Sequence, residues 1–247
     1  MINIKSTSEI LKMRAAGKVV GAALEELEKH IRPGITTKEL DKIAYDYIKS
    51  HNAIPSFLNY NGFPASVCAS INDTVIHGIP DGTKLCEGDI ISLDIGAYLD
   101  GYHSDAARTF AVGNISDEAQ RLIDVTKQSF FEGMKYARHN ERLFSISATI
   151  QDYIESHGYS IVRNYCGHGI GKALHESPDI PNHGVFGRGV RLCKGMTIAV
   201  EPMVNAGGFE TICLSDGWTV KTKDGSLACH YENTVLITDG EPELLTC

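Results

Sequence analysis

The residues of this sequence best suited to chemistry are acidic side chains and histidines that fall within apolar, β-forming segments. The stretch YCGHGIGKALHE at 165–176 holds His168 and His175, seven positions apart. That spacing would place both on one helix face, but three glycines oppose a helix because glycine is a poor helix former. Glycines instead permit close backbone approach and sharp turns. We therefore expect a strand end followed by a loop.

A second cluster is acidic and lies in DIISLDIGAYLDGYHSDAARTF, where Asp94 and Asp105 are eleven positions apart. The Asp-Gly pair at 100–101 is a strong signal for a two-residue hairpin turn of primed type. With that turn, Asp94 opposes Ala107 and Asp105 opposes Gly96. Both carboxylates then project from one sheet face as diagonal neighbours, about 7–8 Å apart. A solvated sheet face would explain this pair, and so would a bound cation.

Two glutamates stand where β-forming segments disfavour them: Glu201 in TIAVEPMV and Glu232 in ACHYENTVLI. Departures of this kind are expected mainly at functional sites, although a buried Glu paired with Lys or Arg is the structural alternative. Together with Asp94, Asp105 and His168 they give ligand-type residues in the order Asp, Asp, His, Glu, Glu. Such a set favours a divalent metal centre.

The chain also repeats itself. YIKSHNA at 47–53 returns 106 residues later as YIESHGY, and CEGDIISLDIG at 86–96 returns 107 residues later as CKGMTIAVEPM. In this alignment Asp94 falls on Glu201, so each half places a carboxylate at the same point of the same strand. A duplicated unit could thus build one site between its halves, where binding sites are frequent.

The elements that must position these residues follow from hydrophobic periodicity. Helices are expected over 8–30, 37–51, 117–137 and 143–157, and strands over 90–99, 106–112, 160–166, 197–204, 209–214 and 230–238. Thr36 or Thr37 is the expected N-cap of the second helix. We predict one catalytic domain over 1–247, internally duplicated into halves of about 1–112 and 113–247.

Composition narrows the class of protein. The 247 residues, 43% of them hydrophobic, suit one large domain. A net charge of −8 and the lack of a basic run oppose a nucleic-acid partner. No apolar segment approaches the length of a membrane span or a signal-peptide core. The seven scattered cysteines lack a CxxC and indicate reduced thiols. We expect a soluble cytoplasmic protein without a nucleic-acid or membrane partner.

In this order and spacing, the motifs resemble the type I methionine aminopeptidases over nearly the whole chain. The matching motifs are HGIP at 77–80, DGYHSD at 100–105, YCGHGIG at 165–171, EPMV at 201–204 and YENT at 231–234. The resemblance implies an α+β "pita-bread" fold, in which two pseudo-symmetric halves enclose a central antiparallel sheet flanked by helices. It also implies a dinuclear metal centre between the halves.

For the site, the resemblance implies two divalent metal ions per chain. His168 and Glu201 would bind one, Asp94 the other, and Asp105 and Glu232 would bridge both. Co, Mn, Fe and Zn all suit these donors, so ligand chemistry leaves the metal open. The implied activity is hydrolytic removal of the initiator methionine from nascent proteins and peptides with a small second residue. Glu201 also matches the family's proton shuttle.

His77 and His175 lie outside this ligand set. By resemblance they are catalytic and hydrogen-bond the substrate near the scissile bond, with a solvated loop histidine as the alternative. The implied methionine pocket consists of Phe57, Tyr60, Phe63, Cys68, His77, Leu174, His175 and Trp218. Ordinary core packing is the alternative for its aromatic members. Asn61, at the expected pocket mouth, stands where His is common.

The sequence departs from the family pattern in the pocket and beside one ligand. Phe57 and Leu174 replace the commoner Cys and Phe, which alters pocket shape. Beside Glu232, His230 replaces Gln and Asn233 replaces His. Partners of metal ligands orient them, and changing such partners can cost about 10–100-fold in affinity or activity. We therefore expect an altered metal preference or slower turnover.

The sequence leaves two other functions open. An enzyme of the same fold with another specificity, such as an Xaa-Pro aminopeptidase, would cleave Ala-Pro peptides rather than Met-Ala-Ser. A non-catalytic binding module of this fold should have lost ligand residues, whereas this chain keeps all five. We expect a monomer; ribosome association is left open.

Overall fold

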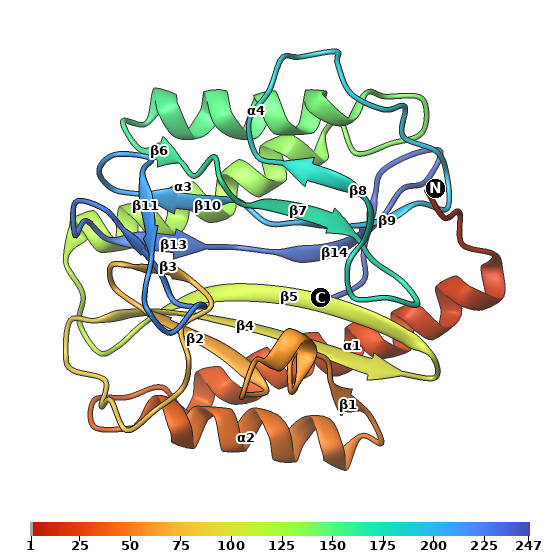
Figure 1. The fold of residues 1–247 in the computed structure, drawn as a ribbon. Helices are drawn as coiled ribbons and strands as arrows, with labels where there is room; N and C mark the ends of the chain where they lie inside the picture. The colour runs from red at the N-terminus through yellow and green to blue at the C-terminus, as the bar shows by residue number, and fades with distance from the viewer. Residues whose placement is uncertain (1) are drawn as a thin grey trace.

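The computed structural model describes residues 2–247 and has an α+β architecture in which strands lie between two helix pairs (Figure 1). The helices are α1 (Thr7–His30), α2 (Thr37–Ser50), α3 (Asp117–Met134) and α4 (Leu143–Ser156). All four predicted helices are confirmed, although α3 ends at Met134 rather than at 137. Thr36 is the N-cap of α2 and forms a capping box with Glu39.

The strands pair in antiparallel fashion throughout. They are β1 (Ile54–Pro55), β2 (Val67–Ile71), β3 (Thr74–Ile76), β4 (Ile90–Leu99), β5 (Tyr102–Ala111), β6 (Ser160–Ile161), β7 (Cys166–Gly169), β8 (Glu176–Pro181), β9 (Thr197–Val200), β10 (Met203–Asn205), β11 (Thr211–Cys213), β12 (Val220–Thr222), β13 (Ala228–His230), β14 (Asn233–Leu236) and β15 (Glu243–Leu244). A short 3-10 helix, η1, covers Tyr60–Gly62. Two sheets matter most for the site: β1-β4-β2 with β5 on β4, and β15-β14-β9-β7-β8.

The hairpin of β4 and β5 has the predicted register. Asp94 pairs with Ala107, and Gly96 pairs with Asp105. The turn residues at 100–101 both have positive φ, 51° and 90°, as a primed turn requires. The acidic pair therefore shares one sheet face.

Continuous strands over 160–166, 197–204 and 230–238 were wrong predictions. The first segment divides into β6 and β7, the second into β9 and β10, and the third into β13 and β14. The latter two breaks face each other. Pro202 lies in one of them and has no N–H to offer a ladder, although its carbonyl accepts a hydrogen bond from Tyr231 N at 3.2 Å.

Each helix pair covers its own apolar core. The first core joins α1 and α2 to β2, β4 and β5, and the second joins α3 and α4 to the strands that follow them. Both cores are built of buried aliphatic residues such as Leu24, Leu40 and Ile91, and Leu122, Ile146 and Ile198. Two helices followed by strands thus recur along the chain. Duplication of halves at about 1–112 and 113–247 remains a prediction.

Within residues 2–247, no helix combines the length and the apolar character that a membrane span needs.

Candidate functional site

A cavity of about 170 Å³ gathers every site residue that the sequence predicts. Its lining comprises the ligand-type residues Asp94, Asp105, His168, Glu201 and Glu232, and the pocket residues Phe57, Tyr60, Phe63, Cys68, His77, Leu174, His175 and Trp218. Asn61, expected at the pocket mouth, completes the lining. Residues from both halves of the chain therefore meet in one place.

Asp94 and Asp105 reach the cavity from the same face of the β4–β5 hairpin. Space beside them depends on Gly96, since a Cβ there would lie 2.8 Å from the Cβ of Ser56. The backbone of Asp105 is held by Thr234, whose Oγ1 accepts from its N and donates to its O, each at 2.9 Å. The hairpin is thereby tied to β14 of the other half.

Glu201 and Glu232 lie in the two facing strand breaks. Asn233 pairs with Val200 on one side of the breaks, and His230 pairs with Met203 on the other. The same register carried across the breaks sets Glu201 opposite Glu232. In addition, the N–H of Glu232 donates to the carbonyl of Ala107 at 3.0 Å, which fixes this carboxylate beside the hairpin.

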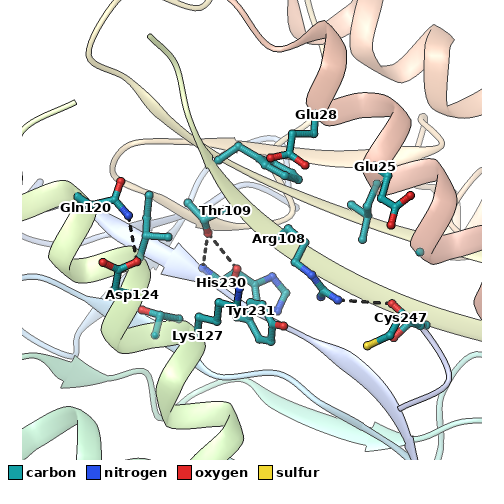
Figure 2. Close-up of a pocket in the computed structure, with 16 residues that line it drawn as sticks. Glu25, Glu28, Arg108, Thr109, Gln120, Asp124, Lys127, His230, Tyr231 and Cys247 are labelled. Carbon is teal, nitrogen blue, oxygen red and sulfur yellow. Dashed lines mark hydrogen bonds between the residues drawn. The ribbon is translucent and has the colours of Figure 1, made fainter. Parts of the chain in front are cut away.

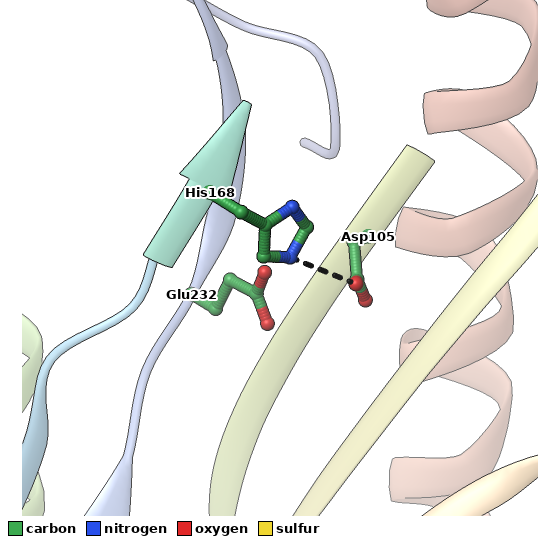
Figure 3. A group of neighbouring side chains, drawn as sticks. All are labelled: Asp105, His168 and Glu232. Atoms are coloured by element: carbon green, nitrogen blue, oxygen red, sulfur yellow. Dashed lines mark ion pairs between the residues drawn. The ribbon is translucent and has the colours of Figure 1, made fainter. Parts of the chain in front are cut away.

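His168 projects from β7 with its ring orientation set by the backbone. Its Nδ1 donates to the carbonyl of Gly169 at 2.9 Å, which leaves Nε2 free for the cavity. Nε2 lies 3.9 Å from Oδ2 of Asp105 and 3.6 Å from Oε1 of Glu201. Figure 3 shows the ring directed between Asp105 and Glu232. Asp105, His168 and Glu232 thus converge from β5, from β7 and from the position before β14.

The electrostatics of the carboxylates fit a cation. Burial raises the pKa of Asp94 to about 7, and burial with neighbouring carboxylates raises the pKa values of Asp105, Glu201 and Glu232 well above their usual range. Within residues 2–247, one oxygen each of Asp94, Asp105 and Glu232 is buried without a hydrogen-bond partner. Because unpaired buried acids are costly, this donor set suits divalent metal ions.

The two cavity histidines outside the ligand-type set are held in defined positions. His77 has a left-handed backbone with φ 58°, a costly conformation for a non-glycine residue that is typical of functional sites. Burial lowers its pKa to about 4. The Nδ1 of His175 lies 2.6 Å from the hydroxyl of Tyr60, and its ring packs on that of His168 with centroids 4.2 Å apart. Burial lowers the pKa of His175 as well.

Apolar side chains form the rest of the lining. Phe63 and Trp218 meet edge to face, with ring centroids 5.1 Å apart. Cys68 opposes Asp94 across β2 and β4 and therefore shares the face of the carboxylates. Leu174 packs in the same apolar cluster and is 2% exposed. These residues pack together as a core cluster and also line the cavity. The same side chains therefore serve both as packed core and as cavity wall.

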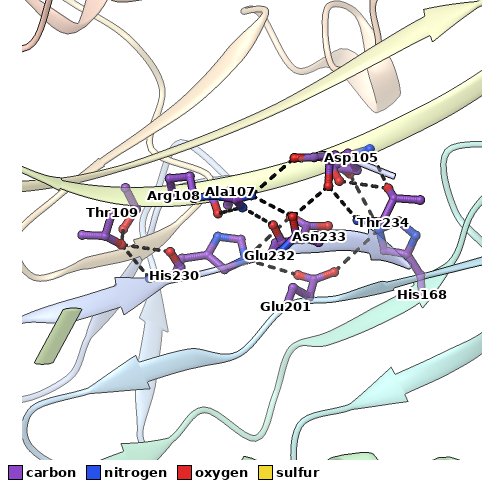
Figure 4. A network of polar contacts seen from close by, with 12 residues as sticks. Asp105, Ala107, Arg108, Thr109, His168, Glu201, His230, Glu232, Asn233 and Thr234 are labelled. Atoms are coloured by element: carbon purple, nitrogen blue, oxygen red, sulfur yellow. Dashed lines mark hydrogen bonds and ion pairs between the residues drawn. The ribbon is translucent and has the colours of Figure 1, made fainter. Parts of the chain in front are cut away.

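Sequence reasoning missed the residues that position the ligand-type side chains. The Arg108 guanidinium donates to the carbonyl of Glu232 at 2.5 Å and to Oδ1 of Asn233 at 2.7 Å (Figure 4). The Thr246 hydroxyl donates to the same Asn233 oxygen at 2.9 Å. Asn233, a departure from the family pattern, is thus an acceptor for Arg108. Only the position of Thr234 could have been noticed in advance, since it lies two residues after Glu232 on the same strand face.

The other departure, His230, lies against the carboxylates. Its Nε2 is 3.8 Å from Oε2 of Glu201 and 3.9 Å from Oε2 of Glu232. Burial lowers the pKa of His230 to about 3, so the imidazole is neutral.

His230 also borders a second cavity, of about 400 Å³, on the helix side of the strands (Figure 2). Its walls come from α1 with Glu25 and Glu28, from α3 with Asp124 and Lys127, and from β5. None of the predicted site residues lines it.

Comparisons with known proteins agree with this architecture. Residues 11–239 match the model of metallopeptidase family M24. The chain is 58% identical over 247 residues to methionine aminopeptidase of Clostridium acetobutylicum, covering 100% of this chain and 99% of the relative. It is 51% identical over 246 residues to methionine aminopeptidase 1 of Bacillus subtilis, with the same coverage. The crystal structure of methionine aminopeptidase from Rickettsia prowazekii superposes with a TM-score of 0.99 at 44% identity, covering 100% of both chains. The predicted pita-bread fold is confirmed.

Proposed function

This chain belongs to metallopeptidase family M24, and from that premise we propose that it is a methionine aminopeptidase. It hydrolyses the first peptide bond of proteins and peptides that begin with methionine and continue with a small residue. Full-length relatives at 51–58% identity carry this name. The observation that carries the proposal is a single cavity, lined by buried acids and a histidine together with apolar side chains.

The proposed cofactor is a pair of divalent metal ions, Co, Mn, Fe or Zn. His168 and Glu201 would hold one ion, Asp94 the other, and Asp105 and Glu232 would bridge them. The unpartnered buried carboxylate oxygens support this assignment. When bound, such ions supply an activated water and polarise a carbonyl group.

The side chains of the cavity take the remaining roles. His77 and His175 hydrogen-bond the peptide next to the scissile bond, and Tyr60 fixes the ring of His175 by the contact at 2.6 Å. Their lowered pKa values support neutral rings that can donate one hydrogen bond each. Glu201 moves a proton toward the leaving amine; burial and the neighbouring carboxylates raise the pKa of this carboxyl, which supports a role as proton acceptor.

Selection of methionine is assigned to the apolar wall. The thioether is polarizable and adapts to aromatic edges, which the contact of Phe63 with Trp218 provides. Phe57, Cys68 and Leu174 complete this wall.

We further propose that the enzyme works as a cytoplasmic monomer on nascent polypeptides. Seven free cysteines support a reducing compartment. The net charge of −8 supports the absence of a nucleic-acid partner.

The test is an assay of purified protein loaded separately with Mn, Fe, Co and Zn. Release of Met from Met-Ala-Ser, with an Ala-Pro peptide left intact, is expected with at least one metal. Release of Ala from the Ala-Pro peptide instead would assign the alternative Xaa-Pro specificity. No release from either peptide with any of the four metals would refute the proposed activity.

A further inference from the structure

His230 carries a buried nitrogen atom without a partner. The side chain is 1% exposed, and its Nε2 has no hydrogen-bond partner within residues 2–247. Figure 4 shows the ring directed at Glu201 and Glu232 rather than at a backbone group. A buried polar atom without a partner costs free energy, which a ligand at this nitrogen would offset.

Strand register places the three side chains together. His230 ends β13 and Glu232 precedes β14, so the two lie two positions apart and share a strand face. On either side of the breaks, β9 pairs with β14 and β10 pairs with β13 in one common register. The same register places Glu201 opposite Glu232. The cluster is therefore built by the backbone rather than by the chance orientation of long side chains.

The spacing of this cluster matches that around His168. From Nε2 of His230, the carboxylate oxygens lie at 3.8 and 3.9 Å; from Nε2 of His168 they lie at 3.9 and 3.6 Å. An N–H···O hydrogen bond would need about 2.7–3.2 Å. Two ligand atoms that each lie about 2.0–2.2 Å from the same ion are farther apart from each other than that, at up to roughly twice the distance from ligand atom to ion.

We propose that Glu201, His230 and Glu232 hold a divalent transition-metal ion in addition to the two ions proposed above. Oε1 of Glu201 faces His168 and its Oε2 faces His230, so this carboxylate bridges the two positions. The donor set is one imidazole and two carboxylates. Imidazole favours Zn, Cu, Fe or Ni over Mg and Ca. Metal binding at this position does not depend on whether the chain removes methionine.

The test uses His230→Gln, which keeps a polar side chain of similar reach, restores the residue common in the family that the chain resembles, and removes the imidazole. His51→Gln is the matched control, because His51 is exposed and does not line the cavity. Co²⁺ binding to the purified full chain is measured by calorimetry and equilibrium dialysis. Wild type and His51→Gln should bind one equivalent more than His230→Gln.

Crystals of the wild-type protein soaked with Co²⁺ give a second, direct measurement. An anomalous peak within bonding distance of Nε2 of His230 is expected, and it should vanish in His230→Gln while the peaks near Asp94 and His168 persist. Equal stoichiometry and affinity in the two proteins, or wild-type peaks confined to the five-residue set, would overturn the proposal. Should His230→Gln not fold, the wild-type crystal alone decides. Failure here leaves the Met-Ala-Ser assay, and hence the proposed activity, untouched.

Discussion

The hydroxyl of Thr234 makes two hydrogen bonds with the backbone of Asp105, accepting from its N and donating to its O at 2.9 Å each. Thr234 belongs to β14 and Asp105 to β5, so one side chain fastens strands from the two halves of the chain. A third bond, from the N–H of Glu232 to the carbonyl of Ala107, continues this seam. The geometry of the candidate metal centre thus depends on how the halves are joined.

Replacement of Thr234 by Val should weaken metal binding. Val preserves the shape but leaves the N–H and carbonyl of Asp105 unsatisfied, which costs about 1–3 kcal/mol for each group. Loss of a group that orients a ligand lowers metal affinity by about 10–100-fold. Calorimetric titration with Mn²⁺ measures this, with Thr234→Ser as the control that retains the hydroxyl. Wild-type affinity in Thr234→Val would show that the seam does not position Asp105.

Asp105→Asn should abolish activity almost completely. As a proposed bridge between two ions, this carboxylate contributes charge to both, and an amide supplies none. We expect metal content to fall and kcat/KM on Met-Ala-Ser to drop by about three orders of magnitude or more. Asp100→Asn makes the same chemical change in the exposed turn of the same hairpin, where Asn tolerates the positive φ. Unchanged activity in Asp105→Asn would remove it from the site.

The metal-free protein should lose stability as pH rises. Burial raises the pKa of Asp94 from 3.8 to about 7. The protonated acid therefore stabilises the fold fully below pH 3.8, and this contribution is lost as pH rises toward about 7. Metal ions replace the protons, so the gain in Tm on adding Mn²⁺ should grow between about pH 5 and pH 8. Thermal unfolding across this range measures it, with Asp94→Asn as the control for the slope. A gain in Tm that does not depend on pH would contradict the assignment of Asp94 as a metal ligand.

Local signals were sufficient to predict the register and face of the hairpin, although its second strand is Tyr102–Ala111 rather than 106–112. An Asp-Gly turn fixes both register and face, because side chains alternate along a strand and opposed residues share a face. The prediction for Asp94 and Asp105 needed only two-residue periodicity, and the observed pairs agree with it. Helix bounds were likewise set by caps and apolar spacing, as at Thr36.

The sequence could not reveal features that depend on packing between the halves. The break at Glu232 lies within a continuous β-forming run of the sequence, and only the paired strands show that it faces the break at Glu201 and Pro202. Arg108 bonds to groups more than a hundred positions away, so no local pattern marks it. His230 was noticed as a departure, but its unpartnered nitrogen is a property of burial rather than of sequence.

Gly167→Ala should destabilise the protein through β7 and β9. A Cβ at this position would lie 2.3 Å from the carbonyl oxygen of Ala199, so the strands must separate. Overpacking of this kind costs about 1–3 kcal/mol. Gly82→Ala is the matched control, since its Cβ would meet nothing within 4 Å, and surface changes of that kind alter stability by at most about 0.5 kcal/mol. Urea unfolding of metal-free protein compares them. Equal midpoints would mean that Gly167 is not needed for close strand approach.

Leu174→Ala should alter substrate selection more than chemistry. Leu174 is 2% exposed, lines the cavity and immediately precedes His175. If Leu174 packs against the methionine side chain as proposed, removing its apolar surface costs about 1–3 kcal/mol, or roughly 10–200-fold in kcat/KM. The enlarged pocket should meanwhile favour Phe-Ala-Ser relative to Met-Ala-Ser. Leu192→Ala removes a fully buried leucine from the apolar core beneath α3 and α4, away from the cavity lining, and serves as the control for destabilisation. If both variants keep the wild-type ratio between the two peptides, Leu174 does not contact the first side chain.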